Sequence, residues 1–237
     1  MHKIDEKLAN VTARIKRAAE SAGRNAADVT LLAASKSQPA EQLRLAFAAG
    51  ARRFGENYLQ EALDKQRQLT DLSDIQWHFI GPIQSNKTRA IAEHFNWVHS
   101  VDRVKIAQRL NDQRPAALGP LNICLQVNID NEPSKSGVSL EQLDELALRV
   151  AQMPHLALRG LMAIPAPRNT DASHCSFARV ATALRQLRHQ HPNCPLDTLS
   201  MGMSADLEAA VTAGATIVRI GSDIFGPRAS ATAPTPP

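Results

Sequence analysis

Cysteine is scarce in this chain of 237 residues, which contains only Cys124, Cys175 and Cys194. The number is odd, and no two of them have C-x-x-C spacing. A disulfide framework or a zinc site would need more cysteines in a closer pattern. We therefore expect no metal site and a cytoplasmic protein kept in a reducing environment.

Long apolar segments and dense basic runs are also missing. No stretch reaches the ~18 to 20 apolar residues that a transmembrane helix needs, and the N-terminus has no apolar signal-peptide core. The formal net charge is +4, but lysine and arginine are scattered among acidic residues. Nucleic-acid binding requires a clustered basic face, so we expect neither nucleic acid nor a membrane as a partner. A small anionic ligand fits this charge balance better.

Short apolar segments alternate with longer amphipathic segments along almost the whole chain, after an opening helix over residues 3–22. Eight of the apolar segments are predicted strands, namely 29–34, 52–54, 77–80, 97–99, 121–129, 158–164, 197–199 and 216–220. Near-continuous apolar strands separated by helices are typical of a parallel sheet covered by helices. The pattern predicts one α/β domain over residues 1–228, a (β/α)8 TIM-type barrel with an extra N-terminal helix. An open doubly wound sheet is the alternative, and residues 229–237 are predicted to be a disordered tail.

Lys36 comes directly after the first predicted strand. The active face of such a barrel is the ring of loops that follow the strand C-termini. A partly desolvated lysine at that mouth is shifted toward its neutral, nucleophilic amine, which forms Schiff bases with aldehydes. The alternative is a lysine that simply ends a strand and points to water.

Small residues fill the loops after the seventh and eighth predicted strands, where barrels frequently bind phosphate. Gly202 lets the backbone approach an anion, and Ser204 is predicted to cap a helix that begins near residue 205. Gly221 and Ser222 offer further N–H and hydroxyl donors. For either loop alone, ordinary turn and capping chemistry is the alternative. Together with Lys36, the two loops indicate a site for a phosphorylated aldehyde cofactor.

Arg219 lies on the last predicted strand, just before one of these loops. A guanidinium has hydrogen-bond donors only. If Arg219 faces a pyridine nitrogen, it keeps that nitrogen unprotonated and weakens the ring as an electron sink. Such an arrangement favours holding a cofactor over carbanion chemistry, and a surface salt bridge is the alternative.

Seven stretches of the sequence resemble the YggS/PROSC family of pyridoxal phosphate homeostasis proteins, which shares the alanine racemase N-terminal barrel. They are residues 34–36, 54–58, 78–87, 134–137, 160–163, 200–204 and 219–222, in the family's order. The resemblance implies a fold-type III barrel that holds pyridoxal 5′-phosphate (PLP) as an aldimine on Lys36. It implies Ser204, Gly221 and Ser222 as phosphate ligands. It also implies that Asn57 and Arg219 lie beside the ring, while Ser200 and Met203 line the pocket.

Three residues depart from the pattern of that family. Gln38 stands where many members have lysine, Ala205 where an acid is common, and Asp223 where a small apolar residue is usual. A carboxylate beside a phosphate would weaken binding, so we expect Asp223 to turn outward.

Two functions from different classes fit this resemblance, a PLP carrier and an amino-acid racemase. Racemisation needs a proton donor and an acceptor on opposite faces of the substrate, and Lys36 can serve only one face. Racemases that resemble this barrel take the second group from a tyrosine on an additional β domain across a dimer interface. Tyr58 is the only tyrosine of this chain and is predicted to be a packing residue. We therefore predict no catalytic residue and a monomeric protein that buffers PLP or delivers it to apoenzymes.

Two further side chains have alternative interpretations. His78 lies in a predicted strand and is expected to be a hydrogen-bonded core histidine, not a catalyst. Lys135, in the loop after the fifth strand, either guides an anionic cofactor inward or is an exposed loop lysine.

Overall fold

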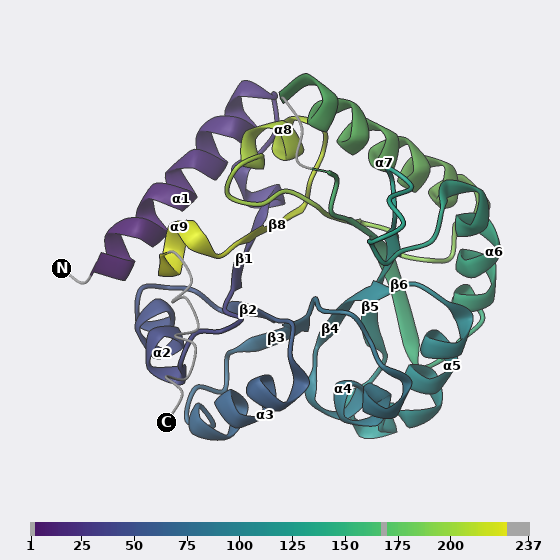
Figure 1. Ribbon diagram of the computed structural model, residues 1–237, viewed down its shortest axis with the longest axis horizontal. Helices are drawn as coiled ribbons and strands as arrows, with labels where there is room; N and C mark the ends of the chain where they lie inside the picture. The colour runs from purple at the N-terminus through teal and green to yellow at the C-terminus, as the bar shows by residue number, and fades with distance from the viewer. Residues whose placement is uncertain (1–2, 167–169, 227–237) are drawn as a thin grey trace, which may run out of the picture.

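The computed structural model of the protein describes residues 3–166 and 170–226 (Figure 1). The predicted disordered tail, 229–237, lies outside the described residues. Among the described helices, none combines the length and the apolar character that crossing a bilayer requires.

Eight parallel strands form a closed barrel in chain order. They are β1 (Thr30–Ala34), β2 (Arg53–Glu56), β3 (Gln76–Phe79), β4 (Trp97–Val101), β5 (Leu121–Val127), β6 (Leu156–Ala163), β7 (Thr198–Ser200) and β8 (Ile217–Ile220). The barrel closes where β8 pairs with β1, from Thr30 opposite Ile217 to Ala33 opposite Ile220. The predicted barrel is confirmed, and the open sheet is excluded because the described sheet has no free edge.

Helices surround the barrel on its outer face (Figure 1). They are α1 (Lys3–Ser21), α2 (Ala40–Ala48), α3 (Leu59–Gln68), α4 (Thr88–His94), α5 (Val104–Gln113), α6 (Leu140–Ala151), α7 (Thr170–Gln190), α8 (Leu207–Thr212) and α9 (Ser222–Phe225). Short 3-10 helices occur at Ala26–Asp28, Ser85–Lys87 and Ala116–Leu118. The sequence pattern did not predict α9, because four residues are too few to show a helical period.

Helix α1 lies along the outer side of the barrel, next to the seam where β8 pairs with β1 (Figure 1). Its buried residues Ile4, Leu8, Val11 and Ile15 recur at helical spacing and form one apolar stripe. This stripe packs α1 against α8 and α9, so the first helix touches the last two (Figure 1). The loops after β7 and β8 are thereby held from outside by the N-terminal helix.

The interior of the barrel contains polar side chains in addition to aliphatic ones. His78, His99, Ser200 and Arg219 are all buried there. Barrel interiors are usually filled by branched aliphatic residues. These four side chains form one hydrogen-bonded row, in which Ser200 contacts Arg219 and His99, and His99 contacts His78.

Candidate functional site

A pocket of about 340 Å³ opens at the C-terminal mouth of the barrel, within the range of roughly 300–1,000 Å³ common for small-molecule sites. It is lined by Ala34, Lys36, Gln38, Asn57, Ile80, Ile164, Met203, Ser204, Ala205, Arg219, Gly221, Ser222 and Gly226. Every predicted binding residue except Ser200 is in this lining. Loops after strands at both ends of the chain therefore meet at one pocket, as parallel strands in a barrel require.

Lys36 follows the buried end of β1 and is itself half-buried. Ser35, the residue before Lys36, is held by two hydrogen bonds. The Ser35 amide donates to the carbonyl oxygen of Gly55 over 2.9 Å, and the Ser35 hydroxyl donates to Oε1 of Glu56 over 2.6 Å. The lysine thus begins from a fixed backbone at the pocket wall.

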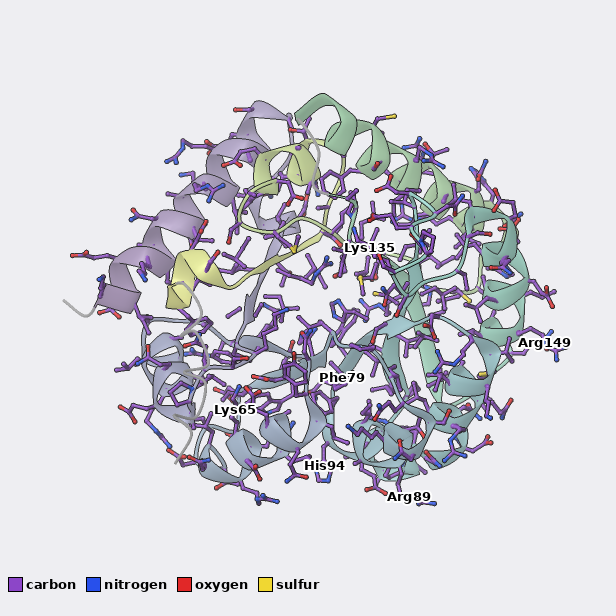
Figure 2. All side chains as sticks on the ribbon, viewed as in Figure 1. Lys65, Phe79, Arg89, His94, Lys135 and Arg149 are labelled. Atoms are coloured by element: carbon purple, nitrogen blue, oxygen red, sulfur yellow. The ribbon has the colours of Figure 1, made fainter. Side chains whose placement is uncertain are left out.

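Lys65, on α3, is a second lysine close to this segment, and its side chain is buried (Figure 2). Its Nζ lies 2.8 Å from the carbonyl oxygen of Ser35, 2.8 Å from Oε1 of Glu56 and 2.5 Å from Oε1 of Glu61. An ammonium has three N–H donors, and these three acceptors use all of them. The Lys65 amine is therefore fully engaged by acceptors of the protein itself.

The residue after Lys36 is held by the same cluster. Ser37 has φ of 60°, a left-handed conformation that is uncommon for a residue other than glycine. Its amide donates to Oε1 of Glu61 over 2.6 Å. Burial raises the pKa of the Glu56 carboxyl, whereas Lys65 and Ser35 favour its charged form. The cluster formed by Ser35, Glu56, Glu61 and Lys65 braces the backbone on both sides of Lys36.

This brace was not predicted from the sequence, although one signal was present. Glu61 and Lys65 are four residues apart on a predicted helix, the spacing of an ion pair on one face. On sequence alone such a pair is indistinguishable from an ordinary surface pair.

Arg219 reaches the pocket from β8, and its guanidinium is held by hydrogen bonds to Ser200 and Ala163. Its Nη1 donates to the carbonyl oxygen of Ser200 over 2.5 Å and to the Ser200 hydroxyl over 2.8 Å. Its Nη2 donates to the carbonyl oxygen of Ala163 over 2.9 Å. Burial lowers the pKa of the Arg219 guanidinium to about 10, so it is a cation at neutral pH. Ser200 is thus a support for Arg219, placed beneath the pocket and not in its lining.

The loop after β7 bends at Gly202, which has φ of +92°. A Cβ there would lie 2.5 Å from the Cβ of Ala210, so glycine is required both for the backbone and for the space. The prediction that Ser204 caps the next helix is wrong. A turn in which the Met203 amide donates to Oδ1 of Asp206 over 2.6 Å delays the helix, and Asp206 is its N-cap.

Ser204 instead faces the loop after β8. Its hydroxyl lies 3.1 Å from the hydroxyl of Ser222, and both residues line the pocket together with Gly221. This part of the pocket lining thereby gathers hydroxyl groups from the loops after β7 and β8. Such donors suit an anionic group.

Asp223 turns away from the pocket, as predicted. Its Oδ2 lies 2.6 Å from Nη1 of Arg14 on α1. Nη2 of the same guanidinium donates to the carbonyl oxygen of Ser204 over 2.9 Å, and Nε donates to Glu208 over 2.8 Å. The unusual carboxylate is neutralised from the outer helix, while Gln38 and Ala205, the other departures, line the pocket.

Asn57 lines the pocket, and its buried Oδ1 has no hydrogen-bond partner among the described residues. The neighbouring Gly81 makes this position possible. A Cβ on Gly81 would lie 2.2 Å from the carbonyl oxygen of Asn57, so only glycine lets the two loops approach. This unpaired amide oxygen in the pocket lining is available to a ligand.

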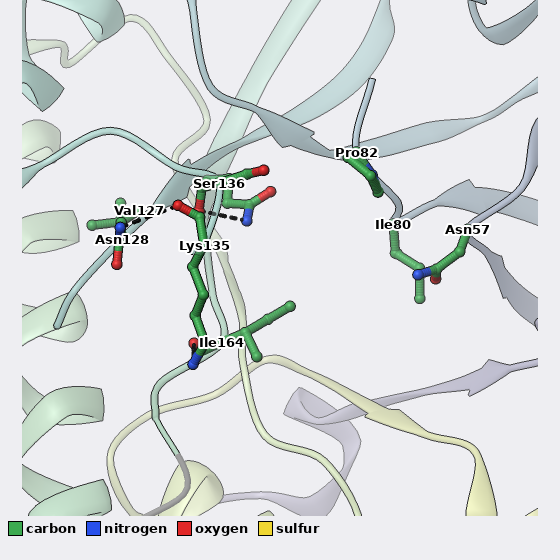
Figure 3. Close-up of a pocket in the computed structure, with 9 residues that line it drawn as sticks. Asn57, Ile80, Pro82, Val127, Asn128, Lys135, Ser136 and Ile164 are labelled. Carbon is green, nitrogen blue, oxygen red and sulfur yellow. Dashed lines mark hydrogen bonds between the residues drawn. The ribbon is translucent and has the colours of Figure 1, made fainter. Parts of the chain in front are cut away.

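A smaller annex of about 190 Å³ adjoins the pocket and shares Asn57, Ile80 and Ile164 with it (Figure 3). Lys135 lies on its edge and is half-buried. Its Nζ donates to the carbonyl oxygen of Ile164 over 3.2 Å and pairs with Glu132 at 2.7 Å. Lys135 is therefore a paired residue of the pocket rim, so the interpretation as an exposed loop lysine is wrong.

Two other expectations have different outcomes. Tyr58 is 58% exposed at the start of α3, so the prediction of a packing residue is wrong: the ring extends outward from a helix cap. His78 is a hydrogen-bonded core histidine, as predicted, with Nδ1 2.9 Å from Nε2 of His99.

Comparison with known proteins identifies the class of this barrel. The sequence pattern of the alanine racemase N-terminal domain matches residues 7–229. Alanine racemase from Corynebacterium glutamicum has a similar fold, with a TM-score of 0.68 at 19% identity, covering 97% of this chain and 62% of that chain. PipY of Synechococcus elongatus, solved with PLP bound, is more similar, with a TM-score of 0.85 at 39% identity over 94% of this chain and 100% of PipY.

Curated relatives narrow the class further. The pyridoxal phosphate homeostasis protein of Pseudomonas aeruginosa is 62% identical over 96% of this chain and 97% of its own length. The protein of the same name from Escherichia coli K12 is 53% identical over 96% of this chain and 98% of its own length. The chain therefore belongs to the family of pyridoxal phosphate homeostasis proteins.

Proposed function

We propose that this protein binds PLP as a Schiff base on Lys36 and buffers or delivers the cofactor without turning over a substrate. The observation that carries the proposal is that Lys36 and the Ser204–Ser222 hydroxyl pair line one pocket. A molecule with an aldehyde at one side and a phosphate at the other can engage both. PipY, a relative solved with PLP bound, supports this choice of ligand.

The residues of the pocket fit the chemistry of PLP. The cofactor supplies an aldehyde, whose condensation with a primary amine forms a C=N bond and releases water. Lys36 is half-buried in the pocket lining and supplies the primary amine that this reaction needs. The unpartnered Oδ1 of Asn57 offers an acceptor beside the ring, and Ser204 and Ser222 offer donors to the phosphate.

Arg219 favours storage of the cofactor over its use in catalysis. Its guanidinium is cationic and is fixed by Ser200 and Ala163. Facing the pyridine nitrogen, a donor of this kind leaves that atom unprotonated and makes the ring a poor electron sink. We infer that the protein keeps PLP reactive toward amines without promoting carbanion chemistry.

The racemase alternative lacks a second proton-exchanging group. The described lining of the pocket contains no histidine, cysteine, tyrosine, aspartate or glutamate. Lys36 is the only side chain of that lining suited to exchange a proton near neutral pH, because an arginine stays protonated. Tyr58 is exposed and lies outside the lining. A non-enzymatic carrier, acting as a monomer, fits these residues better than a racemase.

The proposal is tested by loading the protein with PLP, reducing it with borohydride and mapping the modified peptide. The modification should fall on Lys36, and Lys36→Ala should lose the visible absorption band of the bound cofactor. Lys135→Ala, which removes an amine at the rim of the same mouth, is the matched control and should keep that band. A band that survives in Lys36→Ala, or a modified peptide elsewhere, would contradict the assignment.

Delivery is tested separately, by measuring reactivation of a PLP-dependent apoenzyme in free mixture and across a dialysis membrane that blocks protein contact. Faster reactivation in free mixture would support direct transfer to apoenzymes, and equal rates would support buffering alone. If the wild type interconverts D- and L-alanine measurably, the protein is a racemase and the carrier proposal is wrong.

A further inference from the structure

A second, polar cavity of about 730 Å³ lies at the opposite, N-terminal mouth of the barrel. It is lined by Arg24, Asp28, Thr30, Arg53, Gln76, His78, Trp97, Asn122, Arg159, Asp197, Thr198, Thr216 and Ile217. Each of the eight strands contributes at least one of these residues. The cavity is separate from the proposed cofactor pocket, since no residue is common to the two linings.

The charges in this cavity are unevenly compensated. Arg159 is engaged by Asp197 through two hydrogen bonds of 3.0 and 2.6 Å and lies over the ring of Trp97. Arg24 donates to a backbone carbonyl, and Asp28 is close enough to favour its charged form. Arg53 donates only its Nε, to Gln76, and forms no ion pair within the described part of the chain. Arg53 is therefore a cation in the cavity without an anionic partner there.

A chain of side-chain hydrogen bonds runs from the cofactor end of the barrel toward this cavity. Nη1 of Arg219 lies 2.8 Å from the Ser200 hydroxyl, which lies 2.7 Å from Nδ1 of His99. Nε2 of His99 lies in turn 2.9 Å from Nδ1 of His78. His78 is 1% exposed and is also a lining residue of the cavity.

The direction of this chain follows from its first member. A guanidinium only donates, so the Ser200 oxygen accepts from Arg219 and is free to donate its own proton to Nδ1 of His99. His99 then carries its proton on Nε2 and donates it to Nδ1 of His78. The reverse direction would leave the buried Ser200 hydroxyl hydrogen without an acceptor, which is unfavourable. Burial lowers the pKa of His78 to about 3 and that of His99 well below its usual value, so both rings are neutral.

The last member of the chain is left with an unused donor. In the derived direction, His78 carries its proton on Nε2, and this buried atom has no partner in residues 3–166 and 170–226. Buried N–H groups in proteins nearly always find an acceptor. Arg53, from the adjacent strand β2, is near enough to disfavour a positive charge on the His78 ring. Both unused donors therefore belong to one region of the cavity.

We propose that the N-terminal mouth of the barrel binds a small oxyanion, a carboxylate or a phosphate, through the guanidinium of Arg53 and the Nε2–H of His78. The anion supplies the acceptor that His78 lacks and the negative charge that Arg53 lacks. Bound there, it completes a continuous line of hydrogen bonds that ends at Arg219 in the other pocket.

The test is an NMR titration of the PLP-loaded protein, labelled with ¹⁵N in histidine, with inorganic phosphate at constant ionic strength. The Nε2 resonance of His78 should shift saturably. Arg53→Gln should weaken this response about tenfold, the effect expected for one charge-assisted hydrogen bond. Arg52→Gln is the matched control, because Arg52 is the preceding residue but donates to Phe47 and Ala51 outside the cavity. It removes the same charge and should leave the titration unchanged.

Three results would overturn the proposal: no response of His78, a response that is equally weakened in both variants, or a response that sodium chloride reproduces. The first would mean that water alone satisfies Nε2. If Arg53→Gln does not fold, Arg53→Lys, which keeps the charge, replaces it and should retain most of the binding. Because the readout lies on His78 itself, the result does not depend on which lysine holds PLP.

Discussion

The guanidinium of Arg14 lies 2.6 Å from the carboxylate of Asp223, and the same side chain donates to the backbone of Ser204. One residue of the first helix thus joins the two loops that are proposed to hold the cofactor's phosphate. It also neutralises a carboxylate that departs from the family pattern and lies one residue after Ser222.

Replacing Arg14 by alanine should weaken PLP binding by about two- to fivefold, because a partly exposed ion pair contributes roughly 0.5–1 kcal/mol. The dissociation constant is measured by fluorescence titration of the apoprotein. Adding Asp223→Ala to Arg14→Ala should restore part of the affinity by removing the unpaired carboxylate. Lys16→Ala, on the exposed side of the same helix and paired with Glu20, is the control and should bind like the wild type.

Lys65→Met should destabilise the protein by about 3–5 kcal/mol, since it leaves the buried Glu56 without its cationic partner. The free energy of unfolding is measured with urea on the apoprotein. Lys105→Met removes an exposed lysine from α5 and should change it little. If the Lys65→Met variant is as stable as the control, the ion pairs around Lys36 do not contribute to the free energy of unfolding.

The buried histidines should make stability depend on pH. Burial lowers the pKa of both rings in the folded state, to about 3 for His78. Below the unfolded pKa of about 6.5, the unfolded chain therefore binds protons that the folded protein does not. The stability that the neutral rings contribute is full above that pH and is lost as pH falls. Between pH 6.5 and 5, each ring should remove up to about 1.4 kcal/mol of stability per pH unit. Urea unfolding at several pH values measures this slope. His99→Gln should flatten it, whereas His94→Gln, an exposed histidine of α4 (Figure 2), should not.

Gly202→Ala and Gly214→Ala separate backbone strain from steric overlap. Both glycines have positive φ, +92° and +104°, but a Cβ at 202 meets Ala210 at 2.5 Å while the nearest atom at 214 is 3.8 Å away. Gly214→Ala should cost about 1–2 kcal/mol from the left-handed backbone, and Gly202→Ala about 1–3 kcal/mol more. Thermal unfolding compares the two. Equal losses would mean that the loop before Ser204 moves aside without strain.

Much of the fold could be predicted because its signals are local and repeated. Each strand is a short apolar segment, and eight of them alternating with helices leave few arrangements. The grouping of Lys36 with Gly221 and Ser222 followed from the same topology, since all parallel strands end at one mouth. The position of Ser200 was less accessible. Ser200 is the last residue of β7. At the end of a strand, a difference of one residue decides whether a side chain lines the pocket or lies beneath it.

Other features depend on contacts between distant parts of the chain, which no local pattern records. Arg14 meets Asp223 across 209 positions of sequence. Lys65 looks like a surface residue until α3 is packed against the end of β1. The start of α8 at Leu207 depends on a turn closed by Asp206, which sequence alone does not distinguish from a helix capped by Ser204.

The proposed cofactor site draws Lys36 from the first strand and its remaining ligands from the last two, and β8 closes the barrel against β1. A nascent chain on the ribosome therefore has its amine long before it has its phosphate loops. If the proposal is right, the complete set of contacts to PLP exists only after the final strand has emerged and docked, so that set cannot assist the early steps of folding during synthesis.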